Sequence, residues 1–560
     1  MRKNFWKKAL AMALCAVMTV PAVACGDKVG SGEKVDKTKT QLNVFHYFAG
    51  FGDAWLIELA DNFEEAVKDI SFEEGKTGVQ VHKRGEMTDF DSGKLKSSAY
   101  DVFFLEGPKN FLNLMATNSL EPLDSIMTTP NADDGNQTIE SKMTAQQQAA
   151  YTYGEHYYGI PHYAGNYGLV YNRDMFEERG FFIAAEPDLE TGDIFVSATN
   201  TQKSVGPDGK TGVIGGIDYS DDDGLPRTYD EFFELCELIY ANGIDPICWP
   251  GMYKQQHIVM LLDNLVANNL GAEQANIRYT FEGEAKNLVV IEDGKPKRDA
   301  DGNFVTETMT VSDGDAWNVA RAEGVYYAFE FIHKILNTPN YYSKSADLTS
   351  VSHTENQQNF LENGSLGKRQ SAMLADGTWW QMEADNVFAY MAAQDEKYSK
   401  ENRKFGWLPL PQPNEAEAAK VASGEKNMTF SDYLNAVACI KADLPTGVRD
   451  AALAFLKYAY TDKALTDFTY TTSTTIGVDY LDQVDRSKLN YYTASLINYL
   501  DKSDIIYQVS ANSRYMQNRN TLTVTSIYGS GSYKDIIAGS SMSVDDFFAG
   551  HTDFYKGCAW

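Results

Sequence analysis

The chain has 560 residues, of which 12% are aromatic, and its 78 acidic residues outnumber the 49 basic ones to give a formal charge of −29. A chain this acidic repels nucleic acids and anionic lipid head groups, so we expect neither as a partner. Beyond the first 24 residues no stretch is apolar for 18 residues, which excludes a later membrane-spanning helix.

The first 26 residues have the features of a secretory signal. Residues 1–8 carry four basic side chains and no acidic one, residues 9–20 are apolar, and residues 22–26 are small around Cys25. This pattern predicts a cleaved signal peptide over residues 1–24. With a cysteine at the cleavage site it resembles a bacterial lipoprotein signal, which implies lipidation of Cys25, although Ala22 stands where that pattern usually has leucine. The alternative is an ordinary signal with an incidental cysteine.

Removal of residues 1–24 takes away four basic residues and changes the formal charge from −29 to −33. A basic patch is therefore not available for membrane attachment, and we expect acyl chains to supply the anchor on the outer face of the cytoplasmic membrane. Residues 25–40 are small and polar without periodicity, which predicts a flexible tether.

The remaining chain, about 520 residues, is too long for a single core and predicts two or more domains. Residues 42–48 are rich in β-forming side chains, and a glycine loop leads to a helix that we expect Asp53 to cap. Further strands are expected at 79–83 and 100–105, and a helix is expected to follow them at 110–116. Strands that alternate with helices predict an α/β domain with a mostly parallel sheet.

The same pattern begins again at a strand over residues 167–172. A helix over 227–240 is expected to start with a capping box of Thr228 and Glu231, and a strand follows at 246–249. A late helix is expected to be capped by Thr446.

Two stretches interrupt this rhythm, at residues 184–225 and 280–312. Both are rich in Gly, Asp and Lys, so we interpret them as hairpin insertions. Asp299, Asp301 and Asn303 begin a calcium-loop spacing, but the position for the bidentate glutamate is Thr310, which favours a plain turn.

The cysteines do not predict a metal site. Cys236, Cys248, Cys439 and Cys558 show no close-pair spacing, so we expect buried free thiols, with a bridge between Cys236 and Cys248 left open. The sequence predicts no cofactor and no metal.

Aromatic side chains gather in loops where a core does not need them, in contrast to Trp55 and Trp317, which we expect to be core residues. These loops are Phe48–Asp53, Tyr163–Tyr167, Trp249–Gly251 and Gly377–Trp380. Three of the four follow a predicted strand, where open α/β sheets bind ligands. Flat rings beside carboxylates and amides suit a pyranose, which has apolar C–H faces and a belt of hydroxyls. If Trp379 and Trp380 lie on a strand, only one of them faces a given cleft.

Catalytic motifs are not evident. The sequence has no Gly-x-Ser-x-Gly, no phosphate-binding Gly-Lys-Ser/Thr loop and no His-Glu-x-x-His, and its eight histidines are scattered. Carboxylate pairs are too common here to indicate glycoside hydrolysis. The residues therefore support no particular catalytic mechanism, and we do not expect an enzyme.

The chain from residue 25 onward resembles a carbohydrate-class extracellular solute-binding protein of family 1, the capture subunit of an ABC importer. The resemblance rests on the order of several segments over more than 400 residues: FHYFAGFGDAWL, YDVFFLEGP, YGIPHYAGNYGLVYNRDMF, PRTYDEFFELCELIYANGIDPICWPG, ADGTWWQME, FGWLPLPQPN and AALAFLKYAYTDKALTDF.

This resemblance implies a two-lobed, type II periplasmic-binding-protein fold of the α/β class. The lobes would be residues 41–164 with 411–467, and 167–406 with 470–560. Crossing segments near 163–167, 406–411 and 467–475 would act as a hinge that a ligand closes by touching both lobes. The implied ligand-binding residues are Tyr47, Phe51, Asp53, Glu106, Tyr163, Asn166, Trp249, Asp376, Trp379 and Trp380.

The implied function is capture of a carbohydrate, an oligosaccharide in view of the chain length, by a monomer that delivers it to membrane permeases. Two alternatives stay open. One is a secreted polysaccharide-degrading enzyme, and the other is a binding protein for a peptide or a uronate, for which Arg514 is a candidate anion partner.

Overall fold

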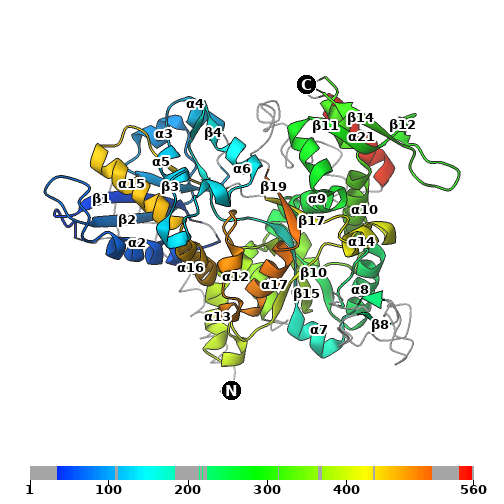
Figure 1. Ribbon diagram of the computed structural model, residues 1–560. Helices are drawn as coiled ribbons and strands as arrows, with labels where there is room; N and C mark the ends of the chain where they lie inside the picture. The colour runs from blue at the N-terminus through cyan, green and yellow to red at the C-terminus, as the bar shows by residue number, and fades with distance from the viewer. Residues whose placement is uncertain are drawn as a thin grey trace, which may run out of the picture.

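The computed structural model describes residues 34–48, 50–107, 111–182, 213–214, 217–218, 224–312, 314–362, 369–432, 436–507 and 542–557. Within these ranges the chain forms two α/β lobes, each built around its own sheet and its own buried core (Figure 1). The α/β class and the two-lobed fold are therefore confirmed.

The first lobe contains a five-stranded sheet. Strand β3 is buried at all four residues, as expected for a strand that is covered on both faces. The sheet order is β2 (Val79–Glu86), β1 (Thr40–Tyr47), β3 (Val102–Leu105), β18 (Val437–Ile440) and β6 (Ile160–Pro161). Its helices are α2 (Ala54–Ala66), α3 (Ser92–Ser97), α4 (Phe111–Ala116), α5 (Asp124–Met127), α6 (Ala145–Ala150), α15 (Thr446–Ala459) and α16 (Asp462–Thr472).

The second lobe contains a four-stranded sheet in the order β10 (Asp245–Cys248), β15 (Ser371–Gly377), β7 (Tyr167–Asn172) and β16 (Phe405–Leu408). Strand β15 is parallel to β10 and antiparallel to β7. The helices here are α7 (Arg173–Arg179), α8 (Tyr229–Ala241), α9 (Lys254–Thr280), α10 (Glu323–Asn337), α11 (His353–Leu361), α12 (Trp380–Glu383), α13 (Asp385–Ala392), α14 (Glu415–Ala422), α17 (Tyr491–Leu500) and α21 (Val544–Lys556).

Short strand pairs complete the structure. The expected hairpin insertion at 280–312 is present, because β11 (Gly283–Val289) pairs with β14 (Thr306–Val311) and encloses β12 (Ile291–Glu292) and β13 (Lys295–Pro296). Of the insertion at 184–225 the described part holds β8 (Val213–Ile214) and β9 (Ile217–Asp218). The other pairs are β4 (Thr152–Tyr153) with β5 (His156–Tyr157), and β17 (Met428–Asp432) with β19 (Ser503–Tyr507).

Three segments run between the lobes, and only the first lies where the sequence predicts it. Residues 162–166 lead from β6 to β7. The segment after β16 stays with the second lobe, since β17 pairs with β19 and contacts α9, and the chain reaches the first sheet only at β18. The expected boundary at residue 411 therefore moves to about 436. Residues 476–484 still pack in the first core, so the third crossing follows them rather than spanning 467–475.

One of the three predicted helix caps is present and two are not. Thr228 and Glu231 form the expected capping box of α8. Thr446 is the first residue of α15, however, with Pro445 in the capping position. Asp53 precedes α2 without a side-chain cap bond.

The remaining sequence expectations concern thiols and membrane segments. Cys236, Cys248 and Cys439 are buried free thiols, as expected, whereas Cys25 and Cys558 lie outside the described residues together with the signal peptide. Residues 299–303 form a turn, in which Asp299 Oδ1 accepts hydrogen bonds from the N–H groups of Asp301 and Asn303. Among the described helices none has both the length and the apolar character needed to cross a bilayer.

Candidate functional site

The two lobes meet where the loop after β1 touches α12. A Cβ atom added to Gly50 would lie 2.7 Å from Trp379 Cδ1 and 2.8 Å from Glu383 Cγ, so the backbone of the first lobe lies directly against both side chains. Only a residue without a side chain allows this approach. The junction of the lobes therefore depends on Gly50.

Trp379 lies at the centre of this junction. Its side chain is half-buried and packs against the cores of both lobes. The Phe51 ring of the first lobe meets the indole edge-on, with the ring centroids 6.5 Å apart. The Tyr167 ring of the second lobe also lies with its centroid 6.5 Å from that of the indole. A half-exposed indole in this position offers an apolar face that a solute between the lobes can cover.

The expected aromatic residues of the first lobe support this position. Phe51 is buried and stacks on Tyr163 with centroids 4.3 Å apart. The hydroxyl of Tyr163 lies 3.5 Å from the carbonyl oxygen of Tyr47. These three residues therefore form one group beneath the loop that touches Trp379.

Two carboxyl groups of the second lobe, both close to Trp379 in the sequence, share one donor. Gln357 Nε2 donates to Asp376 Oδ2 at 3.0 Å and to Glu383 Oε2 at 2.7 Å, so one amide serves two acids. Burial, with the Glu383 charge as the second cause, raises the pKa of Asp376 to about 7. Burial likewise raises the pKa of Glu383 to about 7.

Glu106 brings a third carboxyl group from the end of β3. Its pKa is raised to about 8, chiefly by burial and then by the charges of Glu383, Asp432 and Asp89. Its Oε2 is buried and has no hydrogen-bond partner among the described residues. Because Glu106 belongs to the first lobe and Glu383 to the second, the acidic group spans the junction.

The first crossing segment adds Asn166. This side chain is fully buried, and neither Nδ2 nor Oδ1 has a hydrogen-bond partner within the described ranges. The neighbouring N–H of Gly165 donates to Asp432 Oδ1 at 3.2 Å. Buried polar groups are nearly always hydrogen-bonded, so such a group at a junction points to a site for a polar ligand or water.

Three expected site residues lie apart from this group. Trp249 is fully buried beside Tyr342, with ring centroids 4.7 Å apart. Trp380 is fully buried in a core cluster with Phe405. Asp53 is exposed at the start of α2. We therefore retain the other seven expected residues for the candidate site.

Trp379 and Trp380 follow the strand, as the sequence predicts, and do not lie on it. Strand β15 ends at Gly377, and Trp380 begins α12 with Trp379 in the capping position. The helix turns Glu383 back toward Trp379, whose carbonyl oxygen accepts from the Glu383 N–H at 3.2 Å. Sequence reasoning missed Glu383 because a strand does not bring residues four positions apart together. Gln357 and Asp432 carried no sequence signal at all.

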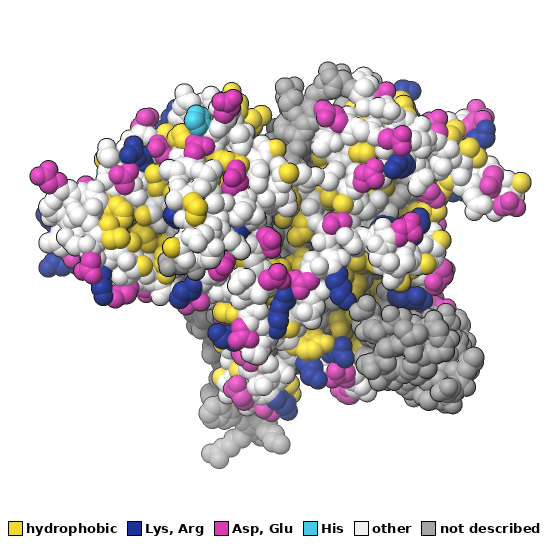
Figure 2. All heavy atoms as spheres, in the orientation of Figure 1, with side chains coloured by type: hydrophobic (Ala, Val, Ile, Leu, Met, Phe, Trp, Pro, Cys, Tyr) yellow, Lys and Arg dark blue, Asp and Glu magenta, His cyan; other side chains and the backbone are white. Residues whose placement is uncertain are grey.

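Figure 2 shows a furrow between the two lobes. Residues of both lobes also line an open groove of about 480 Å³. Lys142 and Gln147 line it from the first lobe, and Asn276 and Tyr507 line it from the second. Tyr507 is the register partner of Asp432, whose charge acts on Glu106. A volume of this size falls in the range of small-molecule sites.

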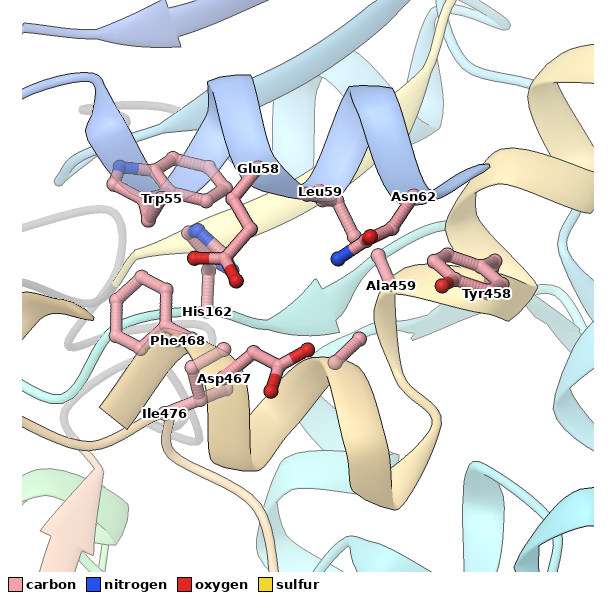
Figure 3. A pocket seen from close by; sticks show the side chains of 11 residues that line it. Trp55, Glu58, Leu59, Asn62, His162, Tyr458, Ala459, Asp467, Phe468 and Ile476 are labelled. Carbon is pink, nitrogen blue, oxygen red and sulfur yellow. The ribbon is translucent and has the colours of Figure 1, made fainter. Parts of the chain in front are cut away.

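A second cavity lies within the first lobe, between α2 and α16 (Figure 3). Trp55, His162 and Phe468 line it, but its volume is only about 20 Å³. This is room for about one water molecule, so the cavity is too small for a solute.

Gly50 provides a first test of the junction. Replacement of Gly50 by leucine places side-chain atoms where Trp379 and Glu383 lie, and overpacking of this kind costs about 1–3 kcal/mol. We expect the lobes to separate and the radius of gyration from small-angle scattering to rise. Gly314→Leu is the control, since a Cβ there meets no atom within 4 Å. An unchanged radius for Gly50→Leu would show that the lobes do not touch through this loop.

A family profile described as "Bacterial extracellular solute-binding protein" matches residues 52–466. No curated protein matches the chain.

Solved structures share the fold at low sequence identity. A chitin oligosaccharide binding protein has a TM-score of 0.52 at 14% identity, and the match covers 91% of this chain and 98% of that one. The bacterial solute receptor AcbH, described as having an exclusive preference for β-D-galactopyranose, has a TM-score of 0.50 at 12% identity over 93% and 97% of the two chains. A structure from work on xylan utilisation by Caldanaerobius polysaccharolyticus has a TM-score of 0.50 at 12% identity over 91% and 98%.

Proposed function

The chain belongs to the bacterial extracellular solute-binding proteins, and on that basis we propose that it captures a carbohydrate between its lobes for import by an ABC transporter. The observation that carries this proposal is the position of Trp379, a half-buried indole that packs against both cores. The same junction holds polar atoms of Glu106 and Asn166 that have no hydrogen-bond partner among the described residues. A sugar ring has an apolar face for the indole and hydroxyl groups for the polar atoms.

The proposed mechanism is binding followed by hinge closure. The first and second crossing segments contact each other, since His162 N–H donates to the Ala436 carbonyl at 2.8 Å. Ala164 N–H of the first crossing also donates to the carbonyl of Thr475, a residue of the first lobe, at 2.8 Å. A ligand favours the closed state only through contacts that both lobes make at once. Glu106 from one lobe and Trp379 with Gln357 from the other meet this requirement.

The groove lined by both lobes supports an oligosaccharide as the ligand. A single ring on Trp379 leaves the groove lined by Gln147 and Tyr507 free for further sugar units. The names of the similar structures, which include a chitin oligosaccharide binding protein, agree with this class of ligand.

We further propose that the chain is anchored outside the cytoplasmic membrane through a lipidated Cys25 and works as a monomer. The support is the signal-like sequence of residues 1–26. Permease subunits are the proposed protein partners, and the protein is proposed to lack enzymatic activity, in keeping with a family of binding proteins.

Isothermal titration calorimetry against a panel of oligosaccharides tests this function. We expect heat of binding with at least one sugar and no release of reducing ends from glucan, xylan or mannan. Binding of peptides or uronates in place of neutral or amino sugars would contradict the proposal, and release of reducing ends by the pure protein would favour the enzyme alternative.

A further inference from the structure

The three carboxyl groups at the lobe junction come from different parts of the fold, and two of them share one donor. Glu106 follows β3 of the first lobe, Asp376 lies in β15 of the second, and Glu383 ends α12. The only side-chain donor that Asp376 and Glu383 have among the described residues is Gln357 Nε2, which bonds to both. The two lobes therefore present acids to each other.

Acceptors outnumber donors in this group. Gln357 is fully buried, and while its Nε2 serves the two acids, its Oε1 has no partner within the described ranges. Glu106 Oε2 is also buried and has no hydrogen-bond partner among the described residues. Each unpaired buried acceptor costs free energy, so the complete site needs hydrogen-bond donors from a ligand.

The charges that face these acids are mostly negative. In the described part of the chain, no lysine or arginine forms an ion pair with Glu106, Asp376 or Glu383. The groups that act on Glu106 are Glu383, Asp432 and Asp89, with the phenols of Tyr47 and Tyr163 beside it; those around Asp376 are Glu383, Gln357, His353, Cys248 and Tyr492. Buried acids without a cation are unfavourable in their charged form.

Building on the proposed function, we infer that the captured carbohydrate carries a protonated amino group, as an amino sugar does, and that this ammonium group binds among Glu106, Asp376 and Glu383. An ammonium group supplies three donors, no acceptor and one positive charge. The sugar ring that carries it would lie on Trp379, whose face also attracts cations. A neutral sugar can supply donors but no positive charge, so the buried acids lose their charge only by taking up protons.

The sign of the pH dependence separates the two kinds of ligand. With a neutral sugar, closure brings Glu106 to Glu383 and raises the Glu106 pKa, so protons are taken up and affinity falls as pH rises from about 5 to 8. With an ammonium ligand the carboxyls ionise on binding and protons are released. Affinity then rises with pH over the same window, until the amine itself loses its proton.

The test is calorimetry with a β-1,4-linked glucosamine oligomer and with its fully N-acetylated form, at about pH 5.5 and about pH 7.5. At the higher pH we expect the amine to bind about tenfold more tightly or better than its N-acetyl form, with pH trends of opposite sign. Glu106→Gln is expected to remove most of this preference. Glu65→Gln, at an exposed side chain of α2, is the control.

The outcomes distinguish the two proposals. Equal or tighter binding of the N-acetylated or another neutral oligomer at both pH values would overturn the amino-group inference and leave carbohydrate capture intact. A preference for the amine that survives in Glu106→Gln would also overturn it. Failure of every sugar to bind would overturn carbohydrate capture itself.

Discussion

Replacement of Trp379 by alanine is expected to weaken binding of the captured carbohydrate by about 10- to 100-fold and to leave the fold largely intact. The indole is half-buried at the junction and becomes covered when a solute lies on it. Covering a large apolar side chain is worth about 1.5–3 kcal/mol, and each 1.4 kcal/mol is a factor of ten in affinity. Calorimetry with the best ligand of the sugar panel measures the change.

Two other tryptophans serve as controls for this variant. Trp317→Ala removes a half-buried indole of the second lobe that lies beside Arg321 and Lys556, and it should leave affinity unchanged. Trp380→Ala removes a fully buried core residue and is expected to lower stability by about 3–5 kcal/mol. If Trp379→Ala binds the solute as tightly as the wild type, the junction is not the binding site.

Replacement of Lys142 by methionine is expected to destabilise the first lobe by about 3–5 kcal/mol, because it leaves a buried carboxylate without its cation. The Lys142 side chain is 2% exposed, and its Nζ lies 3.1 Å from Asp134 Oδ2 and 2.6 Å from Asp462 Oδ1. It also donates to the Tyr460 carbonyl at 3.0 Å. These contacts join the segment before α6 to the start of α16, and urea denaturation measures their loss.

A matched variant separates this effect from loss of a surface charge. Lys397→Met breaks an ion pair with Asp395 in which the lysine side chain is 62% exposed, and it should change stability by less than about 1 kcal/mol. Addition of Asp134→Asn to Lys142→Met is expected to recover part of the lost stability, since the amide is neutral. Equal unfolding midpoints for Lys142→Met and Lys397→Met would contradict the buried network.

Local signals in the sequence predict many of the elements but not how they assemble. The apolar run 102–105, the strand at 167–172 and the capping box of Thr228 with Glu231 are decided by neighbouring residues, and all three are present. The second crossing is not decided locally. Strand β17 joins the second lobe through its pairing with β19, about 75 residues later in the chain, which no nearby pattern indicates.

The candidate site is predictable only where its residues follow strands. The family resemblance implies Tyr47 and Glu106, and each stands at the carboxyl end of a strand of the first sheet. Gln357 lies on the helix α11, and its role depends on tertiary packing that brings its amide between Asp376 and Glu383. The difference between Trp379 and Trp380 likewise follows from the helix that begins between them.

The contact between the lobes also bears on the proposed specificity. The loop at Gly50 lies against Trp379 and Glu383, and the charge of Glu383 acts on Glu106 of the other lobe. A ligand that supplies donors and positive charge lowers the cost of this approach, whereas a ligand that touches one lobe alone does not.

A crystal structure of the protein with its best-binding oligosaccharide tests the account most directly. We expect one sugar ring against the face of Trp379, with polar contacts to Glu106 from the first lobe and to Gln357 or Glu383 from the second. A sugar bound elsewhere, with Trp379 uncovered and Glu106 Oε2 still without a partner, would contradict it.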